Sequence, residues 1–176
     1  MRKFFGHLKT VTKHRYLVFK HCVKAGIFWR GLLHDLSKFS PVEFINGVKN
    51  YTDGTRSPND KERIKRGYSM AWLHHKGKNK HHFEYWTEIN LKGVPFTAFK
   101  MPLVYVKEMI CDRISACKTY QKENYTDESA LTYFINRGDA RYMHEDTKDL
   151  VLDILTRFAM KGEKEGFSYL RKLKEY

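Results

Sequence analysis

The chain has 176 residues, of which 41% are hydrophobic and 15% aromatic; this composition excludes an intrinsically disordered chain and provides for one domain with a sizeable core. The formal net charge is +13, and the excess of Lys and Arg lies in residues 1–125, because residues 126–176 carry nine basic and ten acidic side chains. Such a positive field attracts a nucleotide, a phosphate ester or nucleic acid, although a basic surface that only keeps the protein soluble fits the charge equally well.

The spacing of apolar residues follows the helical period almost throughout the chain. The first expected helix covers residues 8–25 and ends at Gly26, and the second covers 28–38. Ser40 as N-cap, with Pro41 and Glu43 in the first turn, starts a third helix that ends before the loop 51–59. Further helices are expected over 60–75, 81–90, 102–121, 126–137 and 144–176, with a turn at 93–95 and a break near Gly162. The predicted fold is all-α, with one helical domain of about eight helices over residues 1–176.

Apolar runs and cysteines favour a cytoplasmic protein without a membrane partner. No apolar run approaches the roughly 20 residues that span a bilayer, and the basic N-terminus is not followed by the apolar stretch and cleavage site of a signal peptide. The three cysteines, Cys22, Cys111 and Cys117, form no CxxC motif and lie within helical apolar patterns, which is typical of buried, reduced thiols. None of these features fixes the oligomeric state.

The adjacent pair His34-Asp35 lies in the apolar segment "LLHDLSK". Neighbouring helical residues point about 100° apart, and a buried carboxylate beside an imidazole is costly unless both have partners. A metal ion can bind both side chains. A helix N–H group or an arginine would satisfy the pair as well.

Two further polar residues interrupt apolar helical patterns elsewhere in the chain. His14 lies on the apolar stripe of the first expected helix, and Asp112 lies within "VKEMICDRISACK". A lone histidine of this kind is more often a satisfied core residue, and a lone aspartate more often pairs with an arginine. Three such sites on three helices favour a common metal site of two imidazoles and two carboxylates, suited to a divalent transition metal. Its predicted ligands are His14, His34, Asp35 and Asp112.

The order His, His-Asp, Asp resembles the HD-domain superfamily of metal-dependent phosphohydrolases. The segments "HRYLVFKHCVKAGIFWRGLLHDLSK" and "ICDRISA" carry the resemblance, which covers about residues 8–120. It implies an HD-like helical domain that holds one or two divalent transition metal ions (Mn, Fe, Co, Ni or Zn). It also implies that Lys38, three residues after Asp35, lies near a substrate phosphate.

Four histidines lie in "AWLHHKGKNKHHFEYW", residues 71–86. In members of the resembled superfamily with two metals, histidines between the His-Asp pair and the final Asp hold the second ion. Helical geometry lets at most about two of the four face the site. We expect these to be His75, which continues the apolar stripe of Ile64 and Tyr68, and His81. His74 and His82 are the alternatives.

The implied reaction is hydrolysis of a phosphate ester, above all a nucleotide, by metal-activated water. Asp35 would hold or bridge metal, Lys38 would offset phosphoryl charge, and Glu84 or His81 would move protons. The candidates to orient the ligands are Asn79, Glu84, Tyr85 and Glu108, although Glu108 could also pair with a lysine of its own helix. His21 is either a site residue or a core histidine, and His7 and His144 have no comparable context. A phosphate could be bound by a rim of three lysines, Lys76, Lys78 and Lys80, although such lysines are more often ordinary surface residues. A nucleotide base could stack on the rings of Trp72, Tyr85 and Trp86, although such rings more often belong to the core.

Two other functions remain open from the sequence. HD-like proteins with the same ligand order hold two irons and activate oxygen, and the additional histidines suit such a centre. A domain that binds nucleotides or nucleic acid without catalysis would use the basic surface alone.

Overall fold

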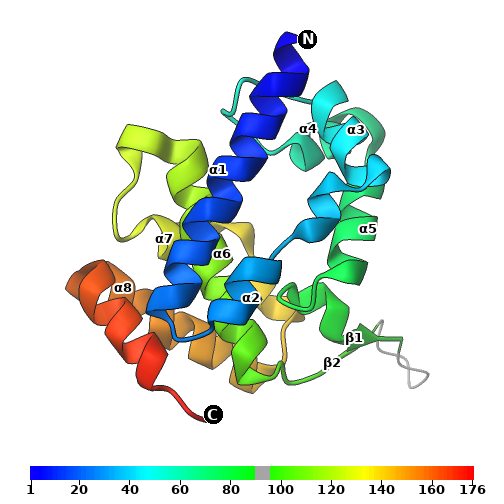
Figure 1. The fold of residues 1–176 in the computed structure, drawn as a ribbon. Coiled ribbons are helices and arrows are strands. Elements are labelled where there is room, and N and C mark those ends of the chain that lie inside the picture. The colour runs from blue at the N-terminus through cyan, green and yellow to red at the C-terminus, as the bar shows by residue number, and fades with distance from the viewer. Residues whose placement is uncertain (90–95) are drawn as a thin grey trace.

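The computed structural model describes residues 1–89 and 96–176, which fold into an all-α domain (Figure 1). Four 3-10 helices and a two-stranded sheet connect the α-helices. None of the described helices is long and apolar enough to cross a bilayer. The predicted fold class is confirmed. The α-helices are α1 (Arg2–Lys24), α2 (Phe28–Leu33), α3 (Pro41–Lys49), α4 (Pro58–Arg66), α5 (Met70–Lys78), α6 (Leu103–Gln121), α7 (Ser129–Arg137) and α8 (Glu145–Lys172).

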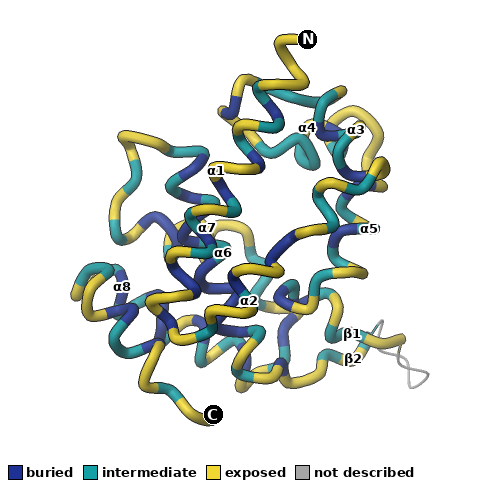
Figure 2. Tube along the Cα trace, in the orientation of Figure 1, coloured by how far each residue is buried: buried dark blue, intermediate teal, exposed yellow. Residues whose placement is uncertain are grey.

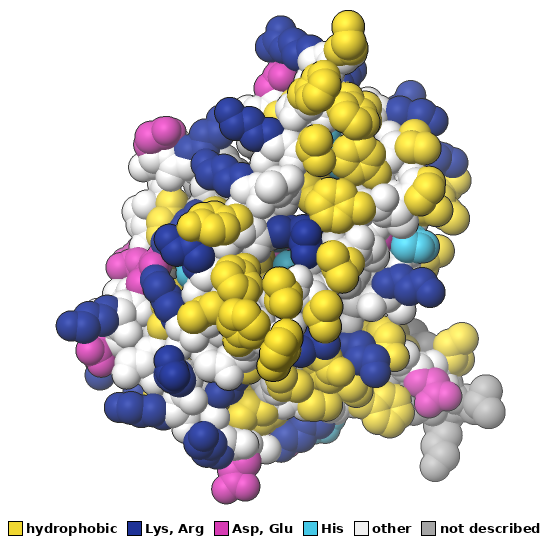
Figure 3. Space-filling model, viewed as in Figure 1, with side chains coloured by type: hydrophobic (Ala, Val, Ile, Leu, Met, Phe, Trp, Pro, Cys, Tyr) yellow, Lys and Arg dark blue, Asp and Glu magenta, His cyan; other side chains and the backbone are white. Residues whose placement is uncertain are grey.

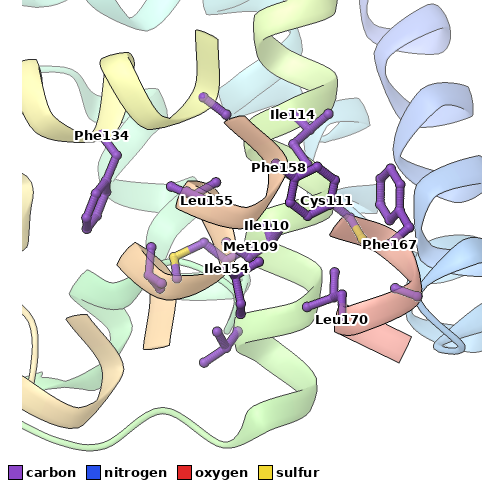
Figure 4. Packing of buried hydrophobic residues seen from close by; sticks show 14 of the residues in the cluster. Met109, Ile110, Cys111, Ile114, Phe134, Ile154, Leu155, Phe158, Phe167 and Leu170 are labelled. Carbon is purple, nitrogen blue, oxygen red and sulfur yellow. The ribbon is translucent and has the colours of Figure 1, made fainter. Parts of the chain in front are cut away.

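Helix α6 lies at the centre of the molecule, packed between α1 on one side and α7 and α8 on the other. Buried positions gather along this axis (Figure 2). Ile110 and Ile114 of α6 are fully buried, as is Ile154 of α8 (Figure 4). Each such side chain contributes about 1.5–3 kcal/mol to folding through burial. This apolar core gives α6 a fixed position, from which Glu108 and Asp112 extend into a polar region.

Several predicted helix boundaries are confirmed. The Ser40 hydroxyl accepts a hydrogen bond from the backbone N–H of Glu43 (3.5 Å) at the start of α3. Pro102 is the N-cap of α6, and α8 breaks at Gly162, whose φ of 75° is readily adopted by glycine. Helix α1 begins earlier than expected, at Arg2.

Residues 28–38 do not form the single helix that was predicted. Helix α2 ends at Leu33, His34 is extended with ψ 130°, and Asp35 is left-handed with φ 52° before the 3-10 helix η1 (Leu36–Phe39). Arg15 of α1 donates from Nε to the His34 carbonyl oxygen (2.8 Å) and stabilises the break. Asp adopts the left-handed region more readily than most residues. The break turns both side chains of the His34-Asp35 pair inward, which a continuous helix would not allow.

The helix predicted over residues 60–75 is two helices. Gly67 ends α4 with φ 79°, and the hydroxyl of Ser69 accepts from the Trp72 N–H to start α5. The prediction that Ile64 and Tyr68 lie on a buried apolar stripe with His75 is therefore wrong, because Ile64 is 71% exposed and Tyr68 52% exposed. A glycine C-cap followed by a serine N-cap explains the division.

The helix predicted over residues 81–90 is also wrong. A 3-10 helix η2 (Phe83–Trp86) leads into β1 (Thr87–Glu88), which pairs antiparallel with β2 (Thr97–Ala98). The Thr87 hydroxyl donates to the Glu84 carbonyl oxygen (2.8 Å) and helps to end the helical turn. The end of the predicted helix and the predicted turn at 93–95 lie outside the described residues.

The surface formed by the first fifty residues is basic and partly apolar. Residues 1–50 contain ten Lys and Arg but only two acidic residues. Both acids are buried, with Asp35 1% and Glu43 7% exposed, so this segment places basic side chains on the surface and no carboxylate. Figure 3 shows a band of apolar side chains over α1, α2 and α3, with Lys and Arg around it. Trp29 is the most exposed side chain of α2 in this band, at 71%.

Candidate metal centre

Three helical segments bring four predicted ligands together. His14 comes from α1, Asp112 from α6, and the His34-Asp35 pair from the break after α2. His14 Nε2 lies 2.9 Å from Asp112 Oδ1, and His34 Nε2 lies 3.2 Å from Asp35 Oδ2. One ligand atom from each residue lies within 4.8 Å of the others, which is close enough to hold one ion. This first ligand group comprises His14, His34, Asp35 and Asp112.

A second set of ligand atoms shares Asp35 with the first group. Asp35 Oδ1 lies 3.4 Å from His75 Nε2 and 3.5 Å from His81 Nε2, whereas the other oxygen, Oδ2, faces His34. The ligand atoms of this set are also within 4.8 Å of one another. Because the two oxygens of one carboxylate face two sets of imidazoles, the arrangement suits two neighbouring metal ions. This second ligand group comprises Asp35, His75, His81 and His82.

His82 corrects the expectation that at most two of the four middle histidines face the site. The ring centroids of His81 and His82 are 4.1 Å apart, and both rings lie beside His75. The expectation assumed a helix at residues 81 and 82, but His82 has φ −92° and ψ 129°. His74 points elsewhere, with Nδ1 2.7 Å from Glu43 Oε1 and 29% of its side chain exposed.

Two carboxylates outside the ligand groups orient the imidazoles. Glu108 Oε1 accepts from His34 Nδ1 (3.0 Å) and lies 3.4 Å from His81 Nδ1. Arg30 holds the other oxygen of Glu108, at 2.8 Å from Nε and 2.6 Å from Nη2. A carboxylate on Nδ1 fixes the ring and leaves Nε2 free for a metal.

Glu43 orients His75 in the same way, since its Oε2 accepts from His75 Nδ1 at 2.7 Å. From the sequence, Glu43 is expected only to help start α3, and no local signal indicates its contact with His75. Asn79, an expected orienting residue, donates to the Ser37 hydroxyl (2.8 Å) and to the His75 carbonyl oxygen (2.8 Å).

The donor set fits a divalent metal because several buried ligand atoms lack hydrogen bonds within the described part of the chain. His34, Asp35 and His75 are each 1% exposed, and His81 is fully buried. Buried polar atoms without partners are rare and costly, and metal ions in the two ligand groups would satisfy all of them. These atoms are His34 Nε2, Asp35 Oδ1, His81 Nε2 and His82 Nε2.

The charges and the burial of the centre favour an ionised Asp35 and neutral imidazoles at His75 and His82. Burial raises the pKa of Asp35, but the neighbouring charges of His34, His75 and Lys38 outweigh burial and hold that pKa well below its usual range. Burial lowers the pKa of His82 well below its usual value, and that of His75 is lowered chiefly for the same reason.

Burial lowers the pKa of His34, but the charge of Asp35 and hydrogen bonds to Asp112 and Glu108 outweigh burial and raise that pKa well above its usual value. Metals bind carboxylates and neutral imidazoles, so Asp35, His75 and His82 match the proposed ligand state, whereas a metal would have to displace the proton of His34.

A cavity of about 350 Å³ opens onto the centre. Lys38 lines this cavity together with several of the ligands, and its Nζ lies 3.1 Å from Asp35 Oδ2. Glu84 lies in the cavity wall, and burial raises the pKa of its carboxyl. Among the candidate base platforms, Trp72 lines the cavity. Tyr85 and Trp86, and the three loop lysines Lys76, Lys78 and Lys80, lie outside its described lining.

The remaining candidates take up other positions. His21 is a core residue: its Nδ1 lies 2.7 Å from the Ser115 hydroxyl, and its ring stacks on Phe167. His7 packs beside Phe44 and Tyr51 near the start of α1. His144 caps α8, where its Nδ1 accepts from the Asp146 N–H at 3.3 Å.

The model of a family of unknown function, DUF5662, matches residues 3–157. The chain belongs to the DUF5662 family. The matched segment contains every member of the two ligand groups and both orienting carboxylates. No curated protein and no solved structure matches this DUF5662 chain.

Proposed function

We propose that this DUF5662 chain is a metal-dependent phosphohydrolase that acts on a nucleotide or another small phosphate ester. The observation that carries the proposal is Asp35, whose Oδ2 faces His34 while its Oδ1 faces His75 and His81. This pattern supports the HD-like ligand arrangement that the sequence resembles. The basic residues of the adjoining cavity support an anionic substrate.

In this proposal each ligand group would hold one of two metal ions. His14, His34 and Asp112 would hold one ion, the three imidazoles of the second group would hold the other, and Asp35 would bridge them. Divalent transition metals (Mn, Fe, Co, Ni or Zn) bound here supply an activated water at neutral pH and polarise the phosphoryl group.

Residues at the cavity end provide the other chemical roles. Lys38 is positioned beside Asp35 to offset negative charge that develops on the phosphoryl oxygens. Because burial raises the pKa of Glu84, this carboxyl is the better candidate to hold a proton for the leaving group. His81 is fully buried within the second ligand group, which favours a ligand role over proton transfer.

A second candidate function is a di-iron oxygenase. The observation that favours it is the nitrogen-rich second ligand group, because three imidazoles suit iron. Reconstitution with iron(II) under anaerobic conditions, followed by measurement of oxygen uptake with organic substrates, separates the two functions. Iron-dependent oxygen uptake without phosphate release would replace the hydrolase proposal. A binder of nucleic acid without catalysis would not need the buried ligand set, and it is less well supported for that reason.

The experiment that tests the hydrolase proposal combines metal analysis with a substrate screen. Wild-type protein reconstituted with each metal is expected to bind about two ions per chain and to release phosphate or nucleoside from members of a nucleotide and cyclic-nucleotide panel. Asp35→Ala should lose both ions and all turnover, whereas His82→Ala should retain about one ion.

His144→Ala is the matched control, because His144 caps α8 and lies outside both ligand groups. The proposal is rejected by metal-loaded wild-type protein that releases no phosphate from any ester. It is equally rejected by turnover that survives in Asp35→Ala.

A further inference from the structure

Arg113 occupies a different wall of the cavity from the metal centre. It follows Asp112 in α6, and neighbouring helical residues point about 100° apart. Asp112 contacts His14 of α1, whereas the Arg113 guanidinium carbon lies 5.6 Å from the Tyr133 ring and 5.2 Å from the Phe134 ring of α7. The two side chains therefore diverge, one toward the ligand groups and the other toward α7.

The charge of Arg113 is not neutralised by a neighbouring carboxylate in the described structure. Other cations of the cavity lining are paired: Lys38 with Asp35 (3.1 Å), Arg63 with Asp60 (2.7 Å) and Arg137 with Asp139 (2.6 Å). Arg56 lies on an exposed loop. Arg113 is half-buried, is held by aromatic rings, and its Nε is buried without a hydrogen-bond partner in the described part of the chain. A guanidinium that lines a cavity and has no carboxylate partner among the described residues favours an anion from outside the chain.

The cavity between the metal centre and Arg113 is lined in part by apolar and aromatic side chains. Met109 and Ala116 lie on α6, the helix that carries both Asp112 and Arg113, and Trp72 and Tyr120 also line the space. Side chains of this kind suit the organic part of a ligand. A ligand in this cavity would thus meet cations at two separate places and apolar contacts between them.

We propose that the substrate is a phosphate ester with a second anionic group, a carboxylate or a phosphate, which Arg113 binds while the reacting phosphate lies at the metal centre. This inference rests on the proposed function and adds the class of substrate. Arg113 acts in recognition, because the two oxygens of a carboxylate or phosphate match the planar guanidinium. Lys38 and the metal ligands serve the reacting phosphate.

Non-hydrolysable probes test the inference without turnover. The probes are 4-(phosphonomethyl)benzamide, 4-(phosphonomethyl)benzoate and 1,4-phenylenebis(methylphosphonate), which share one phosphonate and differ in the group at the far end. Calorimetry on the metal-loaded full chain should show the benzoate or the bisphosphonate, or both, binding roughly tenfold or more tightly than the neutral benzamide. Comparison of the two anions shows which far-end group Arg113 prefers.

Substitutions assign this preference to Arg113. Arg113→Met should reduce the affinity ratio to about one, and Arg113→Lys should keep part of it because the charge remains. Arg141→Met is the matched control, since Arg141 is exposed and lies outside the cavity lining. Circular dichroism establishes that each variant is folded.

Equal binding of all three probes to wild-type protein would overturn the inference, as would an anion preference that persists in folded Arg113→Met. Failure of the proposed function has a different signature. In that case the metal-loaded protein hydrolyses no phosphate ester, whatever the affinities of the probes.

Discussion

At the scale of single residues, the centre depends on carboxylates that play different parts. Asp35 faces both ligand groups, whereas Glu43 and Glu108 contact only the Nδ1 side of the imidazoles. His14, His34, Asp35 and Asp112 were found from the sequence because each interrupts an apolar helical pattern. Glu43 was not, since a glutamate in the first turn of a helix already has an ordinary explanation.

The orienting role of Glu43 predicts a specific loss in Glu43→Gln. Metal affinity should fall roughly 10- to 100-fold, because the carboxylate that fixes His75 at 2.7 Å is replaced by a neutral amide. Competition against a chromophoric chelator measures the change. Glu62→Gln is the control: Glu62 is 3% exposed and accepts from Asn46 and Ser69, away from the ligand groups. Equal affinity losses in the two variants would show that Glu43 acts only through general stability.

At the scale of elements, short helices and their interruptions position the ligands. The sequence predicted the helical segments but joined α2 to η1 and α4 to α5. The two errors have different causes. Local caps at Gly67 and Ser69 divide α4 from α5, although the apolar periodicity continues across them, whereas the break after α2 is fixed by a contact with another helix. Arg15 of α1, for example, binds the carbonyl oxygen of His34 nineteen residues later.

The close packing of α2 on α1 predicts that Gly31→Ala disturbs the centre. A Cβ atom at Gly31 would lie 2.6 Å from Cys22 Cβ and 3.2 Å from Phe19 Cα. Moving α2 to relieve these contacts should cost about 1–3 kcal/mol of unfolding free energy and weaken metal binding, since α2 leads directly to the His34-Asp35 pair. Urea denaturation and metal titration measure the two effects.

Gly77→Ala provides the matched control for this substitution. Gly77 lies in α5, and a Cβ there meets no heavy atom of the described chain within 4 Å. The variant should be about 0.5–1 kcal/mol more stable, because alanine favours a helix over glycine. A Gly31→Ala protein as stable as Gly77→Ala would contradict the packing argument.

At the scale of the whole molecule, the core and the metal centre lie on the same helices. Helix α6 provides both the apolar core and Glu108, Asp112 and Arg113 of the polar side. His21 lies where α1, α6 and α8 meet, beside Ser115 and Phe167. The stability of the fold is therefore linked to the protonation of a histidine that is separate from the ligand groups.

His21 predicts a loss of stability on acidification. Burial, followed by the charge of Lys118, lowers the pKa of His21 from 6.5 to about 4. The unfolded chain then binds more protons than the folded one between these values, so stability is full above about pH 6.5 and falls as pH drops toward 4. The contribution is roughly 3 kcal/mol. Thermal unfolding measured from pH 7.5 to 4.5 should show a smaller pH dependence in His21→Gln than in wild-type protein, and identical slopes would disprove the assignment.

The sequence by itself determined the all-α fold, the starts of α3 and α6, the break at Gly162, and the four residues proposed as the first ligand group, because caps and helical periodicity are local properties. Only the tertiary structure decided that Asp35 belongs to two ligand groups and that His82 belongs to the second. It also decided that Glu43 contacts His75 and that Arg113 lines the cavity. The reason is that side-chain direction after a helix break depends on contacts between helices distant in sequence, which no local pattern contains.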